Sequence, residues 1–201
     1  MIAVIDYDAG NIKSVEKALI HLGKEAVITR DHDLLCRAEK VILPGVGAFG
    51  DAMSKLNEYA LTDVIKEIVK KGTPFMGICL GLQLLFDSSE ESPGVEGLGI
   101  LPGKIIRFPQ SPGFKVPQIG WNSLTFPQKS KLFKGIDEGS YVYFVHSYYL
   151  KADDPVDVAA TSDYILKFDA AVERDNVFAC QFHPEKSSDV GLKILKNFIE
   201  I

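Results

Sequence analysis

Short apolar runs alternate with segments of helical periodicity through the first half of the chain. The runs lie at residues 2–5, 26–29, 41–43 and 75–78. None of them contains a charged residue, which is typical of strands that are buried on both faces of a sheet. Strands that alternate with helices predict a mostly parallel sheet with helices on both sides.

Three helices are expected between and after these strands. The first starts after Asn11, a candidate cap, and ends at Gly23. The second runs from Asp51 to Lys71 as one periodic segment, and the third begins near Leu80.

The second half of the chain has a different pattern. Prolines are frequent between residues 93 and 127, which indicates short strands and turns, antiparallel or at the sheet edge. Further strands are expected at 141–145, 156–160, 165–173 and 177–182, followed by an amphipathic helix from about Ser187. The length suits a single domain over residues 1–201 with a substantial core.

Composition excludes several classes of protein. Hydrophobic residues make up 46% of the chain, charged residues 24%, and the net charge is −5. An acidic chain argues against a nucleic-acid partner, and three cysteines without a CxxC pair argue against a disulfide framework or a zinc site. Because the sequence has neither a signal-peptide pattern nor an apolar stretch that could span a membrane, we expect no membrane partner and a cytoplasmic location.

One cysteine occupies a position that suits a nucleophile. The sequence Gly77-Ile78-Cys79-Leu80-Gly81 lies between a predicted strand and a predicted helix, as in a nucleophile elbow. The glycines leave room for the tight turn, the helix N-terminus favours a thiolate, and the Leu80 N–H would face an oxyanion. The alternative is a buried apolar cysteine, which is what we expect of Cys36 and Cys180.

A cysteine nucleophile needs a base, and His183 is the strongest candidate. It ends the last predicted strand and is followed by Pro184, which interrupts strand pairing. Because residues i and i+2 of an extended chain point to the same side, Glu185 is expected to reach His183 and fix its tautomer. His146 is the competing candidate, but no carboxylate lies near it in the sequence.

The segment from Gly45 to Gly50 matches G-x-G-x-x-G between a strand and a helix. A dinucleotide site would need an acidic residue about 20 positions later at a strand end. Glu67 lies near that distance but inside a helical pattern, so we disfavour a nucleotide site. Two interpretations stay open: backbone N–H groups that face an anion, or a plain turn.

Together these motifs resemble the class I, or triad, glutamine amidotransferases. The family likeness rests on residues 77–83 and on His183-Pro184-Glu185. Residues 8–11, 44–50, 120–122, 143–148 and 183–188 are similar to the subfamily of glutaminase subunits of imidazole glycerol phosphate synthase. The resemblance covers the whole chain and implies a flavodoxin-like fold, an open, mostly parallel sheet flanked by helices, with additional antiparallel strands in the C-terminal half.

The resemblance also implies roles for individual residues. Cys79 attacks the side-chain carboxamide of glutamine, His183 protonates the departing ammonia, and Glu185 orients His183. The oxyanion is held by the backbone N–H of Leu80 and by the glycine loop at Val46 and Gly47. Gln83 and Glu91 hold the substrate, and no cofactor or metal is implied.

The partner implied by the resemblance is a (β/α)8-barrel cyclase subunit in a heterodimer. The cyclase uses the ammonia to make imidazole glycerol phosphate and aminoimidazole carboxamide ribotide. The residues that match family positions near that interface are Asn11, Trp121, Tyr143 and Lys186. Gln118 stands where some relatives have His, which leaves the contacts at that position open.

Two alternatives remain. The chain could serve a different synthase, against which the loop sequence Pro44-Gly45-Val46-Gly47 argues. It could also be a non-catalytic subunit, against which the intact Cys79, His183 and Glu185 argue.

Overall fold

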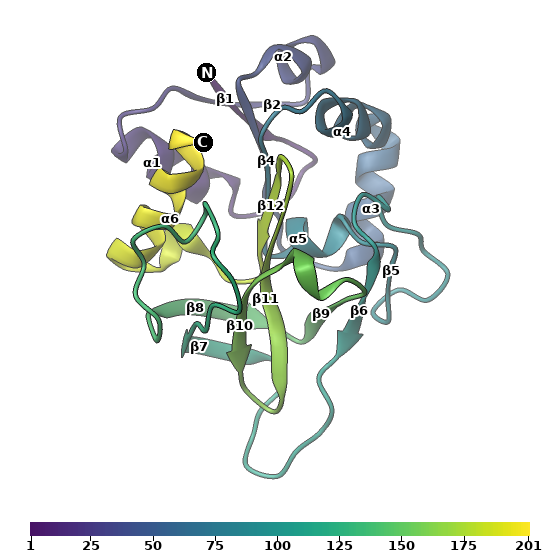
Figure 1. Cartoon of the computed structure of the whole chain (residues 1–201). Helices are drawn as coiled ribbons and strands as arrows, with labels where there is room; N and C mark the ends of the chain where they lie inside the picture. The colour runs from purple at the N-terminus through teal and green to yellow at the C-terminus, as the bar shows by residue number, and fades with distance from the viewer.

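A ten-stranded sheet forms the centre of the computed structural model, which describes residues 1–201 (Figure 1). Its parallel part follows the order β2-β1-β3-β4-β12. These strands are β1 (Ile2–Ile5), β2 (Ala26–Thr29), β3 (Lys40–Leu43), β4 (Phe75–Ile78) and β12 (Val177–Cys180). The order is that of a doubly wound sheet, in which sites form at the carboxyl ends of the strands.

The sheet continues beyond β12 with mostly antiparallel pairing in the order β11-β9-β6-β5, and β10 also pairs with β11. These strands are β5 (Ser88–Ser89), β6 (Gly103–Arg107), β9 (Tyr148–Ala152), β10 (Val158–Asp163) and β11 (Lys167–Arg174). A separate antiparallel pair consists of β7 (Gln118–Ser123) and β8 (Tyr141–His146). The prediction of a mostly parallel sheet with antiparallel additions is therefore confirmed.

Helices cover both faces of the parallel part. α1 (Ile12–His21) and α6 (Ser188–Glu200) lie on one face. The other face carries α2 (His32–Arg37), α3 (Phe49–Glu58), α4 (Leu61–Lys70) and α5 (Leu80–Leu84). Short 3₁₀ turns occur at η1 (Pro155–Asp157) and η2 (Pro184–Lys186).

Each face of the sheet has its own hydrophobic core, and β1 contributes to both. Ile2 and Val4 pack with α1 and α6, whereas Ala3 and Ile5 pack with the helices on the opposite face. Successive strand residues point to opposite faces, so a strand covered on both sides needs an unbroken apolar run. This explains why the four uncharged runs of the sequence are all strands.

The expected single helix from Asp51 to Lys71 is wrong, because the segment forms two helices. Helix α3 ends at Glu58 and α4 starts at Leu61. Between them Ala60 has φ 54° and ψ 32°, a left-handed conformation that stops the first helix. Both helices bury apolar residues at helical spacing, so the periodicity continues through the break and conceals it.

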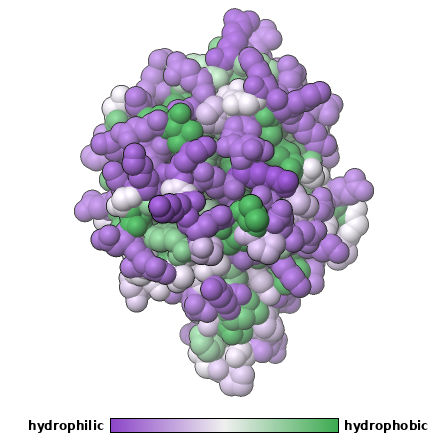
Figure 2. Space-filling view, viewed as in Figure 1, coloured by the Kyte–Doolittle hydropathy of each residue, from purple (hydrophilic) through white to green (hydrophobic).

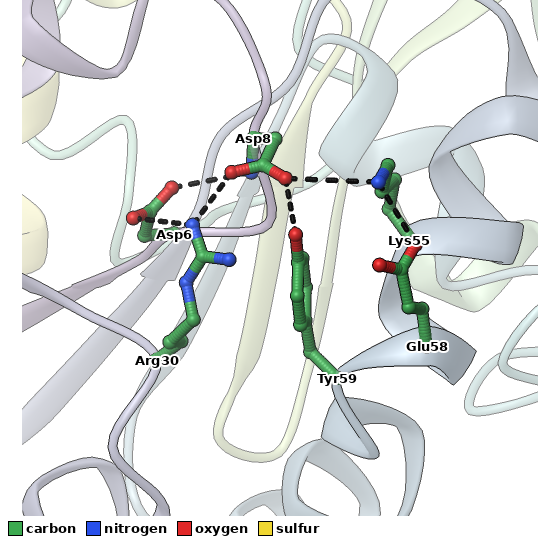
Figure 3. A network of polar contacts seen from close by, with 6 residues as sticks. All are labelled: Asp6, Asp8, Arg30, Lys55, Glu58 and Tyr59. Carbon is green, nitrogen blue, oxygen red and sulfur yellow. Dashed lines mark hydrogen bonds and ion pairs between the residues drawn. The ribbon is translucent and has the colours of Figure 1, made fainter.

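Tyr59, at the end of α3, belongs to a polar network that links this corner to the loop after β1 (Figure 3). Its hydroxyl donates to Asp8, and the Arg30 guanidinium lies 4.1 Å above its ring. Arg30 also pairs with Asp6 at 2.8 Å and with Asp8 at 2.6 Å. The loop between β1 and α1 is thereby tied to the α3–α4 corner.

Four smaller details differ from the expectations. Strand β9 was not expected, and the strand expected from residue 156 begins only at Val158, after η1. Strand β12 ends at Cys180, before Phe182. Asn11 precedes α1 but makes no side-chain capping hydrogen bond; its φ is 68° and its amide points elsewhere.

The surface is mainly polar. Figure 2 shows hydrophilic side chains over most of the view, with hydrophobic atoms in small, separate areas. None of the helices combines the length and the apolar character that crossing a bilayer would require.

Candidate active site

Cys79 lies at the sharp turn between β4 and α5, as the elbow motif predicts. Its φ is 55° and its ψ is −109°, a conformation that non-glycine residues rarely adopt. Its backbone N–H donates to the Cys180 carbonyl at 2.8 Å, so the neighbouring strand β12 holds the turn in place. Backbone strain of this kind is typical of functional positions that the surrounding structure enforces.

The two glycines of the motif are required by close backbone contacts. A Cβ on Gly77 would lie 2.7 Å from the Gly81 carbonyl oxygen. A Cβ on Gly81 would lie 1.9 Å from the carbonyl oxygen of Leu43, at the end of β3. Both positions therefore exclude any side chain, and the steric reason given for the motif is confirmed.

A cavity of about 280 Å³ opens beside Cys79. It brings together the predicted oxyanion and substrate residues Val46, Gly47, Leu80, Gln83 and Glu91. The opposite wall consists of Pro117, Val145, His146, Ser147 and Tyr148. The cavity is near the lower end of the size range of small-molecule sites.

His183 and Glu185 pair as the spacing predicts. Nδ1 of His183 is 2.8 Å from Oε1 of Glu185, and both side chains are almost completely buried. The Asn11 amide donates to the same Glu185 oxygen at 2.6 Å. Asn11, expected at a partner interface, therefore also contacts the proposed triad.

The electrostatics of His183 favour its charged form. Burial by itself lowers the pKa, but Cys79 and the Glu185 carboxylate outweigh burial and raise the pKa of His183 well above its usual value. Nε2 of His183 is buried without a protein partner. An imidazolium next to a sulfur nucleophile can hold the proton that a leaving group later receives.

His146 lines the cavity, but its surroundings differ from those of His183. Its ring nitrogens contact the Tyr148 carbonyl at 2.8 Å and the Gln118 amide at 3.0 Å. Burial is the main cause that lowers the pKa of His146, to about 4. No carboxylate pairs with it, so the geometry supports the choice of His183 as the base.

The predicted oxyanion donors are not assembled in this conformation. The Leu80 N–H donates to the Gly45 carbonyl at 3.3 Å. Because that carbonyl occupies the donor, the peptide between Gly45 and Val46 must rotate before Leu80 can face an oxyanion. Gly47, farther along the loop, has a φ of 106° and open space at its Cβ position.

Glu91 and Gln83 both line the cavity, and each also has a structural contact. Glu91 accepts from the Phe49 N–H at 2.8 Å and so caps α3, the helix that follows the glycine loop. The Gln83 amide donates to the Tyr148 carbonyl at 3.2 Å and to Gln181 at 3.0 Å.

Two residues of the site escaped the sequence analysis. Gln181 is fully buried and its amide nitrogen lies 3.7 Å from the Cys79 sulfur. Tyr7 is also buried, and its hydroxyl donates to the Pro44 carbonyl at 2.8 Å. The available signal for Gln181 was a polar residue in an otherwise apolar strand, two positions before His183.

Neither of the other two cysteines lies at a strained elbow beside the cavity. Cys180 is buried in the core as expected, and burial raises the pKa of its thiol. Cys36 lies in α2, where burial and the nearby Glu67 raise the pKa of its thiol. No group of three or more His, Cys, Asp or Glu side chains is arranged to hold a metal ion.

The expected interface residues lie around one side of the site. Trp121 and Tyr143 are paired across β7 and β8, with ring centroids 6.1 Å apart. Lys186 is exposed in η2, directly after Glu185. The structure thus brings Asn11, Tyr143 and Lys186 near His183 in the fold, since the His183 N–H donates to the Tyr143 carbonyl at 3.0 Å.

The chain is similar in sequence to known proteins. The chain is 49% identical over 201 residues to the imidazole glycerol phosphate synthase subunit HisH of Chlorobaculum tepidum, with 100% of both chains covered. It is 50% identical over 203 residues to the subunit of the same name from Syntrophotalea carbinolica, with 98% of each chain covered.

Solved structures support the fold. A glutamine amidotransferase crystal structure superposes with a TM-score of 0.77 at 20% identity, covering 100% of this chain and 98% of the other. The PurLQS structure from Thermotoga maritima gives a TM-score of 0.73 at 22% identity, covering 99% and 97%. Residues 3–201 also match the family model described as glutamine amidotransferase class-I. With this match and relatives of about half-identical sequence, the chain belongs to the class-I glutamine amidotransferase family.

Proposed function

We propose that this protein is the glutamine amidotransferase subunit of an imidazole glycerol phosphate synthase, and that it hydrolyses glutamine to glutamate and ammonia. The observation that carries the proposal is the placement of Cys79 at a strained elbow, beside a cavity and next to the buried pair of His183 and Glu185. Relatives of about 50% identity that carry this subunit name support the same conclusion.

The reaction begins when the Cys79 sulfur attacks the carboxamide carbon of glutamine. The carbonyl oxygen then carries the negative charge, and His183 gives its proton to the departing nitrogen, which leaves as ammonia. A glutamyl thioester remains on Cys79. His183, now neutral, takes a proton from water as the water attacks the thioester, which releases glutamate and restores the thiolate.

The glycine loop acts as a switch in this proposal. While Gly45 accepts from the Leu80 N–H, the oxyanion site lacks a free donor. Rotation of the peptide between Gly45 and Val46 would remove this carbonyl from Leu80 and direct the Val46 N–H toward the cavity. Two donors would then face the oxyanion, which is the arrangement that acyl transfer requires.

The partner in this proposal is a (β/α)8-barrel cyclase subunit, which docks on the outer face of the β7–β8 pair. Ile119, Trp121 and Tyr141 are 64%, 52% and 58% exposed there, an unusual concentration of large apolar residues. Val145 lies on the same face and also lines the cavity. Ammonia released at Cys79 would therefore emerge directly at the interface. The cytoplasmic location stays a prediction.

The experiment compares Cys79→Ala with the parent protein in the presence of the cyclase and its nucleotide substrate. Synthesis from glutamine should be lost, because no thioester forms, whereas synthesis from added ammonium chloride should remain. Loss of both activities in a folded variant would contradict the assigned role of Cys79.

Partner identity is tested separately. Glutaminase activity of the parent chain should rise strongly when the cyclase and its nucleotide are added, and Trp121→Ala should weaken this association. If a folded chain responds to a different synthase and not to the cyclase, the glutaminase proposal stands and the partner proposal fails. A pull-down of this chain from its native lysate would then identify the synthase.

A further inference from the structure

The side chain of Gln181 forms hydrogen bonds with two residues of the proposed site and with no other residue. It follows Cys180 at the end of β12, and none of its surface is exposed. Its Oε1 accepts from Nε2 of Gln83 at 3.0 Å, and its Nε2 lies 3.7 Å from the Cys79 sulfur. The side chain therefore bridges a cavity-lining residue and the nucleophile.

The Tyr148 carbonyl fixes which end of each side-chain amide, in Gln83 and in Gln181, is the oxygen and which is the nitrogen. The Tyr148 carbonyl is only an acceptor, so the group of Gln83 that faces it at 3.2 Å must be the NH₂. The same NH₂ faces Gln181, which must present its oxygen. The NH₂ of Gln181 then points to the Cys79 sulfur. Gln83 thus donates both to the Tyr148 carbonyl and to Gln181, and Gln181 donates in turn to the Cys79 sulfur.

This order has a consequence at each end. A sulfur that receives a hydrogen bond is favoured as the thiolate, because the thiolate is only an acceptor. At the other end, both hydrogen bonds of the Gln83 side chain use Nε2, which leaves its Oε1 as an acceptor beside the cavity. That oxygen suits a donor on the substrate, such as an ammonium or amide group.

We propose that Gln181 is a positioning residue that stabilises the Cys79 thiolate and fixes the amide of Gln83 so that its oxygen serves the substrate. The proposal rests on Cys79 being the glutaminase nucleophile. A fully buried amide that only filled space would be replaceable by an apolar side chain of similar size. Gln181 instead directs its donor at the reacting sulfur atom.

The test measures the rate at which iodoacetamide alkylates Cys79 as a function of pH, with the modified peptide identified by mass spectrometry. A Cys36→Ser background removes the one cysteine that is not buried. Gln181→Met should slow alkylation at pH 7 about tenfold and move the midpoint to higher pH, since a hydrogen bond to a charged group contributes about that factor or more.

Gln118→Met is the matched control. Gln118 is also buried and also hydrogen-bonded, but its partner is His146 and it does not contact the sulfur. Its alkylation profile should stay within about twofold of the background protein. Equal slowing in both variants, or no change in a folded Gln181→Met protein, would overturn the proposal.

Two further measurements cover the case in which the Met variant does not fold. Gln181→Glu keeps an oxygen for Gln83 but places a carboxylate beside the sulfur, so the thiolate should appear only at higher pH. In the unmodified protein, the side-chain amide ¹⁵N signal of Gln181 should shift with the same midpoint as Cys79 alkylation. If the Gln181 signal does not change at the pH of that midpoint, the proposal is overturned without any variant.

Steady-state kinetics with the cyclase separate the two effects of Gln181. Gln181→Glu preserves the contact with Gln83, so KM for glutamine should change little while kcat falls. Gln181→Met removes both contacts, so KM should rise as well. This assay depends on the proposed function, whereas the alkylation assay does not, so failure of one can be told from failure of the other.

Discussion

The carbonyl oxygen of Gly45 accepts a hydrogen bond from the Leu80 N–H at 3.3 Å, and so joins the glycine loop to the nucleophile elbow. One residue earlier, the Pro44 carbonyl accepts from the Tyr7 hydroxyl at 2.8 Å. Two successive carbonyls of the loop are therefore held by groups from outside it. Any rearrangement that frees the Leu80 donor must break the first of these contacts and can keep the second as its fixed point.

This packing predicts a coupling between Gly45 and Tyr7. A Cβ on Gly45 would lie 2.1 Å from the Tyr7 hydroxyl. Gly45→Ala should lower the free energy of unfolding by about 1–3 kcal/mol through overpacking, and Tyr7→Phe by about 1 kcal/mol through the lost buried hydrogen bond. In the double variant the contact with the hydroxyl is removed and only the Leu80 Cβ stays close, at 3.1 Å, so the combined loss should be smaller than the sum of the two in a urea-denaturation cycle. Additive losses would show that the two positions are not energetically coupled.

A second prediction concerns Asn11, whose amide donates to Glu185 at 2.6 Å. Asn11→Ala removes a donor that stabilises the charged carboxylate and holds it toward His183. We expect kcat for glutamine hydrolysis to fall about tenfold, the factor for a hydrogen bond to a charged group, with little change in KM. Lys13→Ala, two residues later and on the exposed side of α1, is the control and should leave kcat unchanged.

A loss in the Asn11 variant that appears only as weaker binding of the cyclase would contradict this role. The kinetic comparison is therefore made on the chain alone and at saturating cyclase, and the dissociation constant is measured by titration calorimetry. A purely interfacial residue would move the dissociation constant and leave the saturated kcat intact.

Much of the candidate site could be predicted from the sequence, because these features depend on local geometry. Gly77, the placement of Cys79 before a helix, and the i, i+2 relation of His183 and Glu185 each have a steric or stereochemical reason set by neighbours in the chain. Gly81 is different, because the carbonyl that excludes a side chain there belongs to Leu43 of β3.

What the sequence could not predict depends on contacts between distant segments. Asn11 meets Glu185 across 174 positions, and Gln181 meets Cys79 across 102. Asn11 looked like a helix cap because its residue type favours that role. Its left-handed backbone, with φ 68°, instead turns the amide toward the triad. The break at Ala60 was hidden for another reason, since no glycine or proline marks it.

The burial of His146 predicts a pH dependence of stability. Desolvation lowers the pKa of His146 to about 4, whereas an unfolded histidine titrates at about 6.5. Between these values the unfolded chain binds a proton that the folded chain does not. The free energy of unfolding contributed by this group should therefore fall as pH drops from about 6.5 to 4, by about 3 kcal/mol in total, and level off below.

The variant His146→Phe checks this assignment, because the ring sits among Phe108, Phe144 and Phe168. A phenyl group fits those neighbours and cannot be protonated. In urea denaturation between pH 4 and 7, the free energy of unfolding of this variant should lack the fall at low pH that His146 causes in the parent protein. Replacing the exposed His21 by Gln should leave that fall in place, and its disappearance there would refute the assignment.

The left-handed corner at Ala60 supplies a test of the two-helix arrangement. An L-residue at φ 54° is disfavoured relative to glycine, and Ala60 is exposed, so its methyl group contributes little packing. Ala60→Gly should therefore raise the free energy of unfolding by about 0.5–1 kcal/mol and raise Tm by a few degrees. Ser54→Gly, at an exposed position inside α3, should have the opposite effect of about 0.5 kcal/mol because a helix interior disfavours glycine. A single continuous helix would make both substitutions destabilising, so the sign at Ala60 decides between one helix and two.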